Sequence, residues 1–325
     1  MDPLADLLAS QDGVVSRSQA IGVGLQPHDV RRLVRRRDLT PLFPGVFIDH
    51  TGVPTWVQRA WAGVLACAAP GGASGSDLGA ALAGASAMRA ADGPGRAGSE
   101  DGPITVAVPR TRRVVAPRGV RVVRTFGMED RVQWNLGPPR MRYDEAALDV
   151  ALQETGDFAA IGAVSRAVQS RHTTALRMVA ALDARTRAPR RDFLAGVLRD
   201  VAAGSCSVLE HGFLTLVERP HGLPPAQRQK RVGTASGIVY RDAAYGERLI
   251  ELDGRLWHDT AEQRDKDFER DLDAAVAGQG TVRLTWGQVY ERPCSTAAKL
   301  SRLLEVDGWP AARPCGSGCA VADAA

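Results

Sequence analysis

Lysine is almost missing from this sequence: of its 41 basic residues only Lys230, Lys266 and Lys299 are lysine, and the others are arginine. A chain rich in alanine, glycine and arginine often reflects a GC-rich genome, so the arginine bias alone is weak evidence for binding nucleic acid. The formal net charge of +4 is also small. A surface for phosphate would therefore have to come from local clusters of arginine rather than from the overall charge.

Cysteine and long apolar runs are scarce as well. The five cysteines are scattered and odd in number, which argues against a disulfide framework and favours free thiols in a reducing compartment. The opening MDPLADLLAS lacks the basic and apolar segments of a secretion signal, so we expect a cytoplasmic protein. No run reaches the roughly 18 apolar residues of a membrane-spanning helix, so we expect no membrane partner. Cys315 and Cys319 form a Cys-x3-Cys pair without a second pair, so we expect no metal site there.

The first 55 residues predict a winged helix-turn-helix domain. A short helical pattern is followed by a capping box, Ser16 with Gln19, which starts a second helix, and Pro27 suits the first turn of a third. The run LTPLFPGVFIDH then alternates apolar residues around a Pro-Gly pair, as a short β-hairpin does. Three helices followed by a hairpin are the element order of a winged helix.

The third of these helices is strongly basic, because arginines cover the surface that its apolar residues leave free. We expect them to contact DNA phosphates in a major groove. The alternative is a solvated basic helix that only completes a three-helix core. The arginines are Arg31, Arg32, Arg35, Arg36 and Arg37.

The stretch VRRRDLTPLFPGVFI resembles the end of the N-terminal domain of the type IV abortive-infection antitoxins, which usually reads RRG.W.RL.PGVY. The resemblance implies a DNA-binding regulator. Asp38 stands where that pattern tends to have glycine.

Residues 56–202 predict a mixed α/β connector. WVQRAWAGVLACAA has a helical pattern, ITVAVPRTRRVV and GVRVVRTF read as strands, and the chain is helical from Asp144 to about Val201. We find no catalytic constellation in this part of the sequence.

The C-terminal third predicts a compact α/β unit in the order helix, three strands, helix, strand. In the first helix Leu209, Phe213 and Leu216 fall on an apolar stripe, and Glu210 lies beside it. Gly246 and the residue after it have the form of a two-residue hairpin loop between two of the strands.

This hairpin brings acidic residues together. If Tyr245 pairs with Arg248, then Asp242 lies opposite Glu251, where two like charges are destabilising, and Asp253 follows on the same face. A divalent cation bound by these three acids would remove the repulsion, and carboxylate oxygens suit Mg²⁺. The alternative is a solvent-screened sheet face whose acids pair with arginines such as Arg248 or Arg255.

His258 follows five residues after Asp253, just before a helix that the capping box Thr260 with Gln263 predicts. At the mouth of the acidic face it would act as a general base, relay a proton or contact the scissile phosphate.

A series of motifs in this part of the chain resembles endonuclease-like domains related to the very-short-patch-repair endonucleases of the PD-(D/E)XK superfamily. In chain order the motifs are SVLE, LPPAQRQ, YRDAAY, LIELDGRLWH, RDKDFERD and VRLTW. The resemblance spans about residues 203–305. It implies that Asp242 binds the metal and that Glu251 and Asp253 replace the (D/E)xK pair. It also implies that Glu210 is the helix acid and that His258 is the base or phosphate contact. The usual lysine is absent because Asp253 occupies its position, which leaves the general base unassigned.

A chain of 325 residues, 44% hydrophobic and 24% charged, has room for two or three cores, so we expect a multi-domain α/β protein. The expected function is a metal-dependent DNA endonuclease that uses Mg²⁺ or Mn²⁺ on double-stranded DNA. The alternative is a non-catalytic DNA-binding transcriptional regulator or antitoxin. The sequence leaves open whether the chain forms a homodimer or acts with a toxin or defence partner. The expected segments are 1–55 (winged helix), 56–202 (connector), 203–310 (restriction-endonuclease-like domain) and 311–325 (flexible tail).

Overall fold

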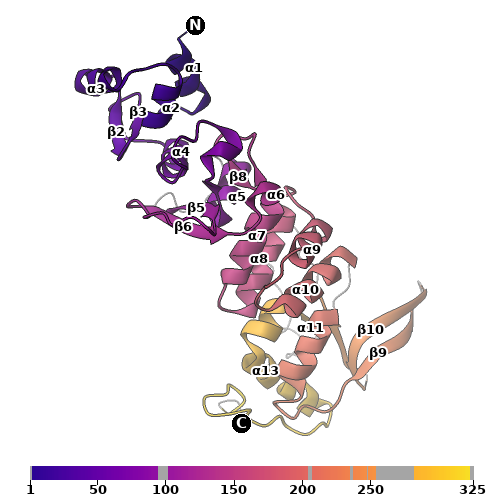
Figure 1. Cartoon of the computed structure of the whole chain (residues 1–325). Coiled ribbons are helices and arrows are strands. Elements are labelled where there is room, and N and C mark those ends of the chain that lie inside the picture. Colours follow the sequence, from indigo (N-terminus) through magenta and orange to yellow (C-terminus); the bar gives the residue numbers. More distant parts are fainter. Residues whose placement is uncertain are drawn as a thin grey trace. The chain divides into compact units, whose positions relative to one another are not determined.

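The computed structural model describes residues 2–93, 102–203, 207–234, 237–246, 248–253 and 282–322. The chain divides into two units, Met1–Val150 and Ala151–Ala325. Each unit contains helices and strands (Figure 1), which confirms the expected multi-domain α/β class. Within the described ranges, none of the helices combines the length and the apolar character that crossing a bilayer requires.

The N-terminal part of the first unit is a winged helix. Its three strands form an antiparallel sheet in the order β1-β3-β2, and Gly45 makes the turn of the wing with a positive φ of 75°. The capping box of Ser16 with Gln19 and the position of Pro27 at the start of the third helix agree with the sequence prediction. The elements are α1 (Pro3–Ser10), β1 (Val14–Ser16), α2 (Arg17–Gly22), α3 (Pro27–Arg36), β2 (Thr40–Phe43) and β3 (Val46–Ile48).

The rest of the first unit is built around a five-stranded sheet in the order β6-β5-β4-β8-β7, in which β5 and β6 are parallel. Its elements are α4 (Trp56–Ala66), η1 (Gly75–Leu78), β4 (Ala81–Leu82), α5 (Gly84–Asp92), β5 (Ile104–Pro109), β6 (Val120–Thr125), α6 (Met128–Arg131), β7 (Val132–Gln133), β8 (Arg140–Met141) and α7 (Tyr143–Gln153), within which the division between units falls.

The winged helix and this sheet share one core, although the sequence placed a boundary after residue 55. Val14 and Ile48 of the wing sheet lie in the same buried cluster as Trp61 of α4 and Val106 of β5. The apolar residues of one unit thus come from both expected segments, because the wing sheet is too small to bury both of its faces alone.

The second unit contains the strands of the expected segment 203–310 and the helices of residues 151–203 before them. Its four strands run in the order β12-β11-β10-β9. The elements are α8 (Asp157–Gln169), α9 (Ala175–Asp183), α10 (Arg191–Ala203), α11 (Ser207–Gly212), η2 (Phe213–Glu218), β9 (Gln227–Thr234), β10 (Gly237–Tyr245), β11 (Arg248–Leu252), β12 (Val282–Leu284), η3 (Gly287–Glu291) and α13 (Pro293–Val306).

The hairpin β10–β11 has the predicted register, since Tyr245 pairs with Arg248 and Ala243 pairs with Ile250. Ile250 and Leu252 are buried, as expected for the face that packs on a helix. Strand β12 then lies parallel to β11, with Glu251 opposite Arg283. The helix predicted between these strands lies outside the described residues, and so does His258.

The apolar stripe of the helix before β9 differs from the prediction in one position. Leu209 and Phe213 are buried, but Leu216 is 36% exposed and Val217 is buried in its place. The helix widens into a π-helical stretch over η2. The wider turn shifts the residues that follow it around the helix axis relative to the α-helical spacing on which the prediction relied.

The C-terminal segment was expected to be a flexible tail, but its described residues 311–322 contact the second unit. The backbone N–H of Ala312 donates to Ser301 Oγ at 2.8 Å, and that of Arg313 donates to the carbonyl oxygen of His221 at 2.8 Å. Cys319 and Val321 are buried in the core of the unit. These residues therefore belong to the folded domain.

Candidate active site and nucleic-acid interface

Helix α3 exposes its arginines because its apolar residues fix which side faces the protein. Val30 is buried, and Leu33 and Val34 pack against the small core of the winged helix. Asp29 accepts a hydrogen bond from the backbone N–H of Gln26 at 3.0 Å, which secures the start of the helix. The five arginines predicted to bind DNA, Arg31, Arg32, Arg35, Arg36 and Arg37, are all exposed.

These arginines differ in their partners. Arg32 pairs with Asp29 at 2.9 Å, and Arg36 pairs with Asp38 at 3.4 Å. For Arg31, Arg35 and Arg37 the described residues offer no acidic partner. Three exposed guanidinium groups on one helix and its cap are suited to contact phosphate oxygens.

The carboxylate of Asp242 lies against the neighbouring strand of the hairpin. Its Oδ2 accepts a hydrogen bond from the backbone N–H of Leu252 at 2.7 Å. The register Ala243 to Ile250 makes Asp242 the next residue of β10 and Glu251 the next residue of β11. The carboxylate of Asp242 is therefore held at the amide between Glu251 and Asp253, beyond the last backbone pair of the hairpin.

Glu251 has a cationic neighbour that the sequence did not reveal. Arg283 Nε on β12 donates to Glu251 Oε2 at 3.1 Å, and the two residues are opposite each other in the parallel pairing. The expected candidates were Arg248 and Arg255. Arg248 instead pairs with Asp307 through two contacts of 2.9 Å, and Arg255 lies outside the described residues. The acidic face thus has an arginine that neutralises part of its charge.

Asp253 and Glu210 are both half-buried and belong to different layers. Asp253 follows β11 directly, and its backbone N–H donates to the carbonyl oxygen of Leu284 at 2.8 Å. Glu210 lies on α11, whose Leu209 shares a buried cluster with Ile250 of β11. Because neighbouring residues of a strand point to opposite faces, the Glu251 side chain lies on the face of β11 opposite to Ile250.

In the part of the chain that the structure describes, these acids are not gathered closely enough to hold one ion as they stand. Asp242 lies at the backbone between Glu251 and Asp253, and Glu251 is held by Arg283. His258 cannot be placed because it lies outside the described residues.

A buried acid, Glu218 on η2, connects the helix to the first two strands. Its Oε2 accepts hydrogen bonds from the backbone N–H of Ala226 at 3.1 Å, from Arg228 at 2.8 Å and from the Tyr245 hydroxyl at 3.0 Å. Burial and the adjacent Glu218 carboxylate raise the pKa of Tyr245, so its hydroxyl stays a donor. The sequence did not indicate this network, whose members lie in three separate elements.

No protein-family model matches the chain. No curated protein sequence matches it either. Among solved structures, the chain is similar to the crystal structure of the RV2827C protein from Mycobacterium tuberculosis, with 19% sequence identity and a TM-score of 0.37. The similarity covers 71% of this chain and 87% of that chain. A TM-score this low does not establish a shared fold.

Proposed function

We propose that the protein is a metal-dependent DNA endonuclease: the arginines of α3 bind duplex DNA, and the acids at the end of the hairpin β10–β11 carry the cleavage site. The observation that carries the nuclease assignment is the position of Asp242. Its carboxylate accepts the Leu252 amide at 2.7 Å and so lies between Glu251 and Asp253.

The donor atoms at this hairpin are of the kind that the required metal takes, although the acids would have to draw closer together than they lie in this structure. Asp242, Glu251 and Asp253 offer carboxylate oxygens, which are the ligands that Mg²⁺ and Mn²⁺ prefer in proteins. A bound ion would polarise the scissile phosphate of the DNA and lower the pKa of a water molecule at this edge of the sheet.

Arg283 has a defined role in the proposed site. Its guanidinium neutralises Glu251 across the parallel strands at 3.1 Å, and it is 55% exposed, so it can turn without disturbing the core. When Glu251 ligates a cation, Arg283 is free to donate to a phosphate oxygen of the DNA, a contact that guanidinium groups make well. Glu210 and His258 remain candidates for an additional acid and for the base.

A non-catalytic DNA-binding regulator is the second candidate, and the ion pair of Glu251 with Arg283 favours it. An acid that already has a cationic partner does not require a metal for charge balance. In this case α3 still binds duplex DNA, and the second unit acts as a binding module for a toxin or another partner protein.

The two candidates differ in a plasmid-cleavage assay with Mg²⁺ or Mn²⁺. We expect the wild type to nick supercoiled DNA, and we expect Asp242→Asn to lower the rate by about 10³-fold, the scale of such electrostatic terms. Asparagine retains an oxygen that can accept the Leu252 amide but lacks the negative charge. Asp307→Asn, which removes an acid of the same unit paired with Arg248, is the matched control and should cleave normally.

Intact plasmid with both metals, together with a normal shift of a duplex probe in the wild type, would exclude the endonuclease and leave the regulator. Equal cleavage by the wild type and Asp242→Asn would place the catalytic site elsewhere.

A further inference from the structure

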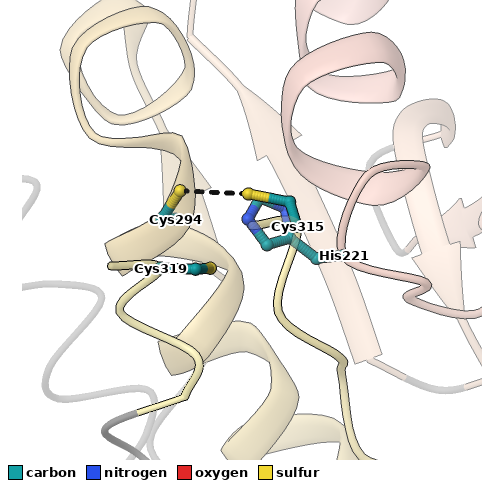
Figure 2. Close-up of side chains that lie close together, drawn as sticks. All are labelled: His221, Cys294, Cys315 and Cys319. Carbon is teal, nitrogen blue, oxygen red and sulfur yellow. Dashed lines mark hydrogen bonds between the residues drawn. The ribbon is translucent and has the colours of Figure 1, made fainter. Parts of the chain in front are cut away.

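Four side chains with metal-binding atoms meet in the second unit, and none of them belongs to the acidic hairpin. They are His221, Cys294, Cys315 and Cys319, and their ligand atoms all lie within 4.8 Å of one another. Figure 2 shows them converging from three parts of the chain: the turn after η2, the start of α13 and the C-terminal segment. The position of three thiols and one imidazole around a common point is a property of the fold, because no short sequence motif connects them.

The spacing of the sulfur atoms suits a shared metal ion. The Sγ atoms of Cys294 and Cys315 are 3.6 Å apart, the contact drawn as a dashed line in Figure 2. A tetrahedral ion with Zn–S bonds of about 2.3 Å holds two sulfur ligands about 3.8 Å apart. A disulfide would bring the sulfur atoms to about 2.05 Å. All three cysteines of the cluster are free thiols.

His221 is oriented as a ligand. The residue is 1% exposed, and its Nδ1 lies 2.8 Å from the carbonyl oxygen of Val217, a contact in which Nδ1–H is the donor. This bond leaves the lone pair on Nε2, and Nε2 is buried with no hydrogen-bond partner among the described residues. An orphaned buried nitrogen is costly unless something binds it, and metal-bound histidines commonly donate their other N–H to a backbone carbonyl.

The local backbone presents the cysteines in a form that metals use. Cys294 follows Pro293 in the first turn of α13, so the start of this helix fixes the position of its thiol. Cys315 and Cys319 lie on one tight turn, in which Gly318 has a positive φ of 76° and the backbone N–H of Cys319 donates to Gly316 at 3.3 Å. Their Cys-x3-Cys spacing is within the range found at structural zinc sites.

We propose that His221, Cys294, Cys315 and Cys319 bind one structural Zn²⁺ ion that fastens the C-terminal segment to α13 and to the turn after η2. Three thiolates and one imidazole complete a tetrahedron and leave no position open for substrate. Sulfur ligands also exclude Mg²⁺ and Mn²⁺, which the proposed nuclease site would use. The zinc site is thus separate in both position and chemistry from the acids of β10 and β11.

The proposal explains why this segment packs as it does. Few contacts among the described residues hold the segment 311–322. They are the burial of Cys319 and Val321 and the backbone hydrogen bonds of residues 312 and 313. A metal ion would add a strong coordinate link between elements far apart in the sequence. Loss of the ion should therefore loosen residues 311–322 before it affects the rest of the unit.

The first test measures zinc in full-length protein, expressed with Zn²⁺ in the medium and purified under reducing conditions without a chelator. We expect about one zinc ion per chain by elemental mass spectrometry, as for a Cys3His site. Cys315→Ser is the main variant, because Cys315 is exposed and its replacement leaves the core intact. We expect it to weaken zinc binding by more than the 10- to 100-fold that loss of an outer contact costs. Ser317→Ala, in the same turn, and Cys67→Ala, in the other unit, should bind zinc normally.

The second test replaces zinc with Co²⁺ and records the absorption spectrum of the full chain. Tetrahedral thiolate ligation gives intense d–d bands and sulfur-to-cobalt charge-transfer bands, which Cys319→Ser should weaken while circular dichroism shows that the variant is folded. Limited proteolysis should cut residues 311–322 faster after a chelator removes the metal.

Three results would overturn the proposal: wild type with reduced thiols that binds neither zinc nor Co²⁺, Cys315→Ser with wild-type zinc affinity, or a Cys294–Cys315 disulfide in the purified protein. None of these readouts is DNA cleavage, so they are independent of the outcome for the nuclease site.

Discussion

The two units hold their charged groups in opposite ways. On α3 of the first unit, Arg31 and Arg35 are exposed without an acidic partner among the described residues. On the hairpin of the second unit, Asp242 already accepts the Leu252 amide and Glu251 already pairs with Arg283. Helix α3 can therefore meet a polyanion as it stands, whereas a metal site at the hairpin first requires Glu251 to exchange its partner.

The largest expected effect in this comparison comes from the unpaired arginines. Replacing Arg31 and Arg35 with alanine should weaken duplex binding about tenfold and lower the slope of log affinity against log salt by about two, because two phosphate contacts are lost. The measurement is a fluorescence-anisotropy titration of a duplex at several salt concentrations. Arg32→Ala with Arg36→Ala is the matched double variant, and we expect a smaller loss because both residues are already paired with aspartates.

An unchanged salt slope in the Arg31 and Arg35 variant would contradict the proposal that α3 binds DNA. A larger loss in the Arg32 and Arg36 variant would mean that pairing with aspartate does not determine which arginines bind.

A smaller effect is expected at the second unit from Arg283→Ala, which frees Glu251. Exposed ion pairs contribute up to about 1 kcal/mol, so Mn²⁺ binding should tighten by up to about fivefold while the melting temperature barely changes. Isothermal titration calorimetry with Mn²⁺ measures the change, and Glu251→Gln, which removes the acid itself, should bind more weakly than the wild type. Mn²⁺ binding that weakens in Arg283→Ala would show that the arginine supports the site rather than competes for Glu251.

The smallest expected effect is that of Asp29→Asn on α3. The change releases Arg32 from its ion pair, while asparagine retains an oxygen for the Gln26 amide. Such a helical pair contributes about 0.2–0.5 kcal/mol, so DNA binding should tighten by about twofold. Asp6→Asn on the exposed surface of α1 makes the same change in net charge and serves as the control. Equal tightening in both variants would mean that only the net charge matters.

Local features of the fold were predictable where short-range rules decide them. The capping box of Ser16 with Gln19 and the pairing of Tyr245 with Arg248 both follow from residues a few positions apart. The burial of Ile250 and Leu252 follows from strand alternation once the hairpin is set.

Predictions became wrong or incomplete where packing intervened. Leu216 is exposed because a π-helical stretch shifts the helical stripe, and the α-helical spacing of apolar residues gives no sign of such a turn. Arg283 reaches Glu251 through a parallel pairing with a long connection, for which no turn sets the register. The shared core of the wing sheet and α4 likewise joins segments that composition alone had separated.

The winged helix, the hairpin and the arginines of α3 follow from the order of the amino acids, since each depends on contacts between near neighbours in the chain. His221 and Cys294, by contrast, come to lie beside the Cys-x3-Cys turn through long-range packing. On its own that turn has two of the four ligands a tetrahedral ion requires, so the sequence argued against a metal site there. Folding brings in the other two from elements far away in sequence, and that convergence is what makes a zinc site physically reasonable.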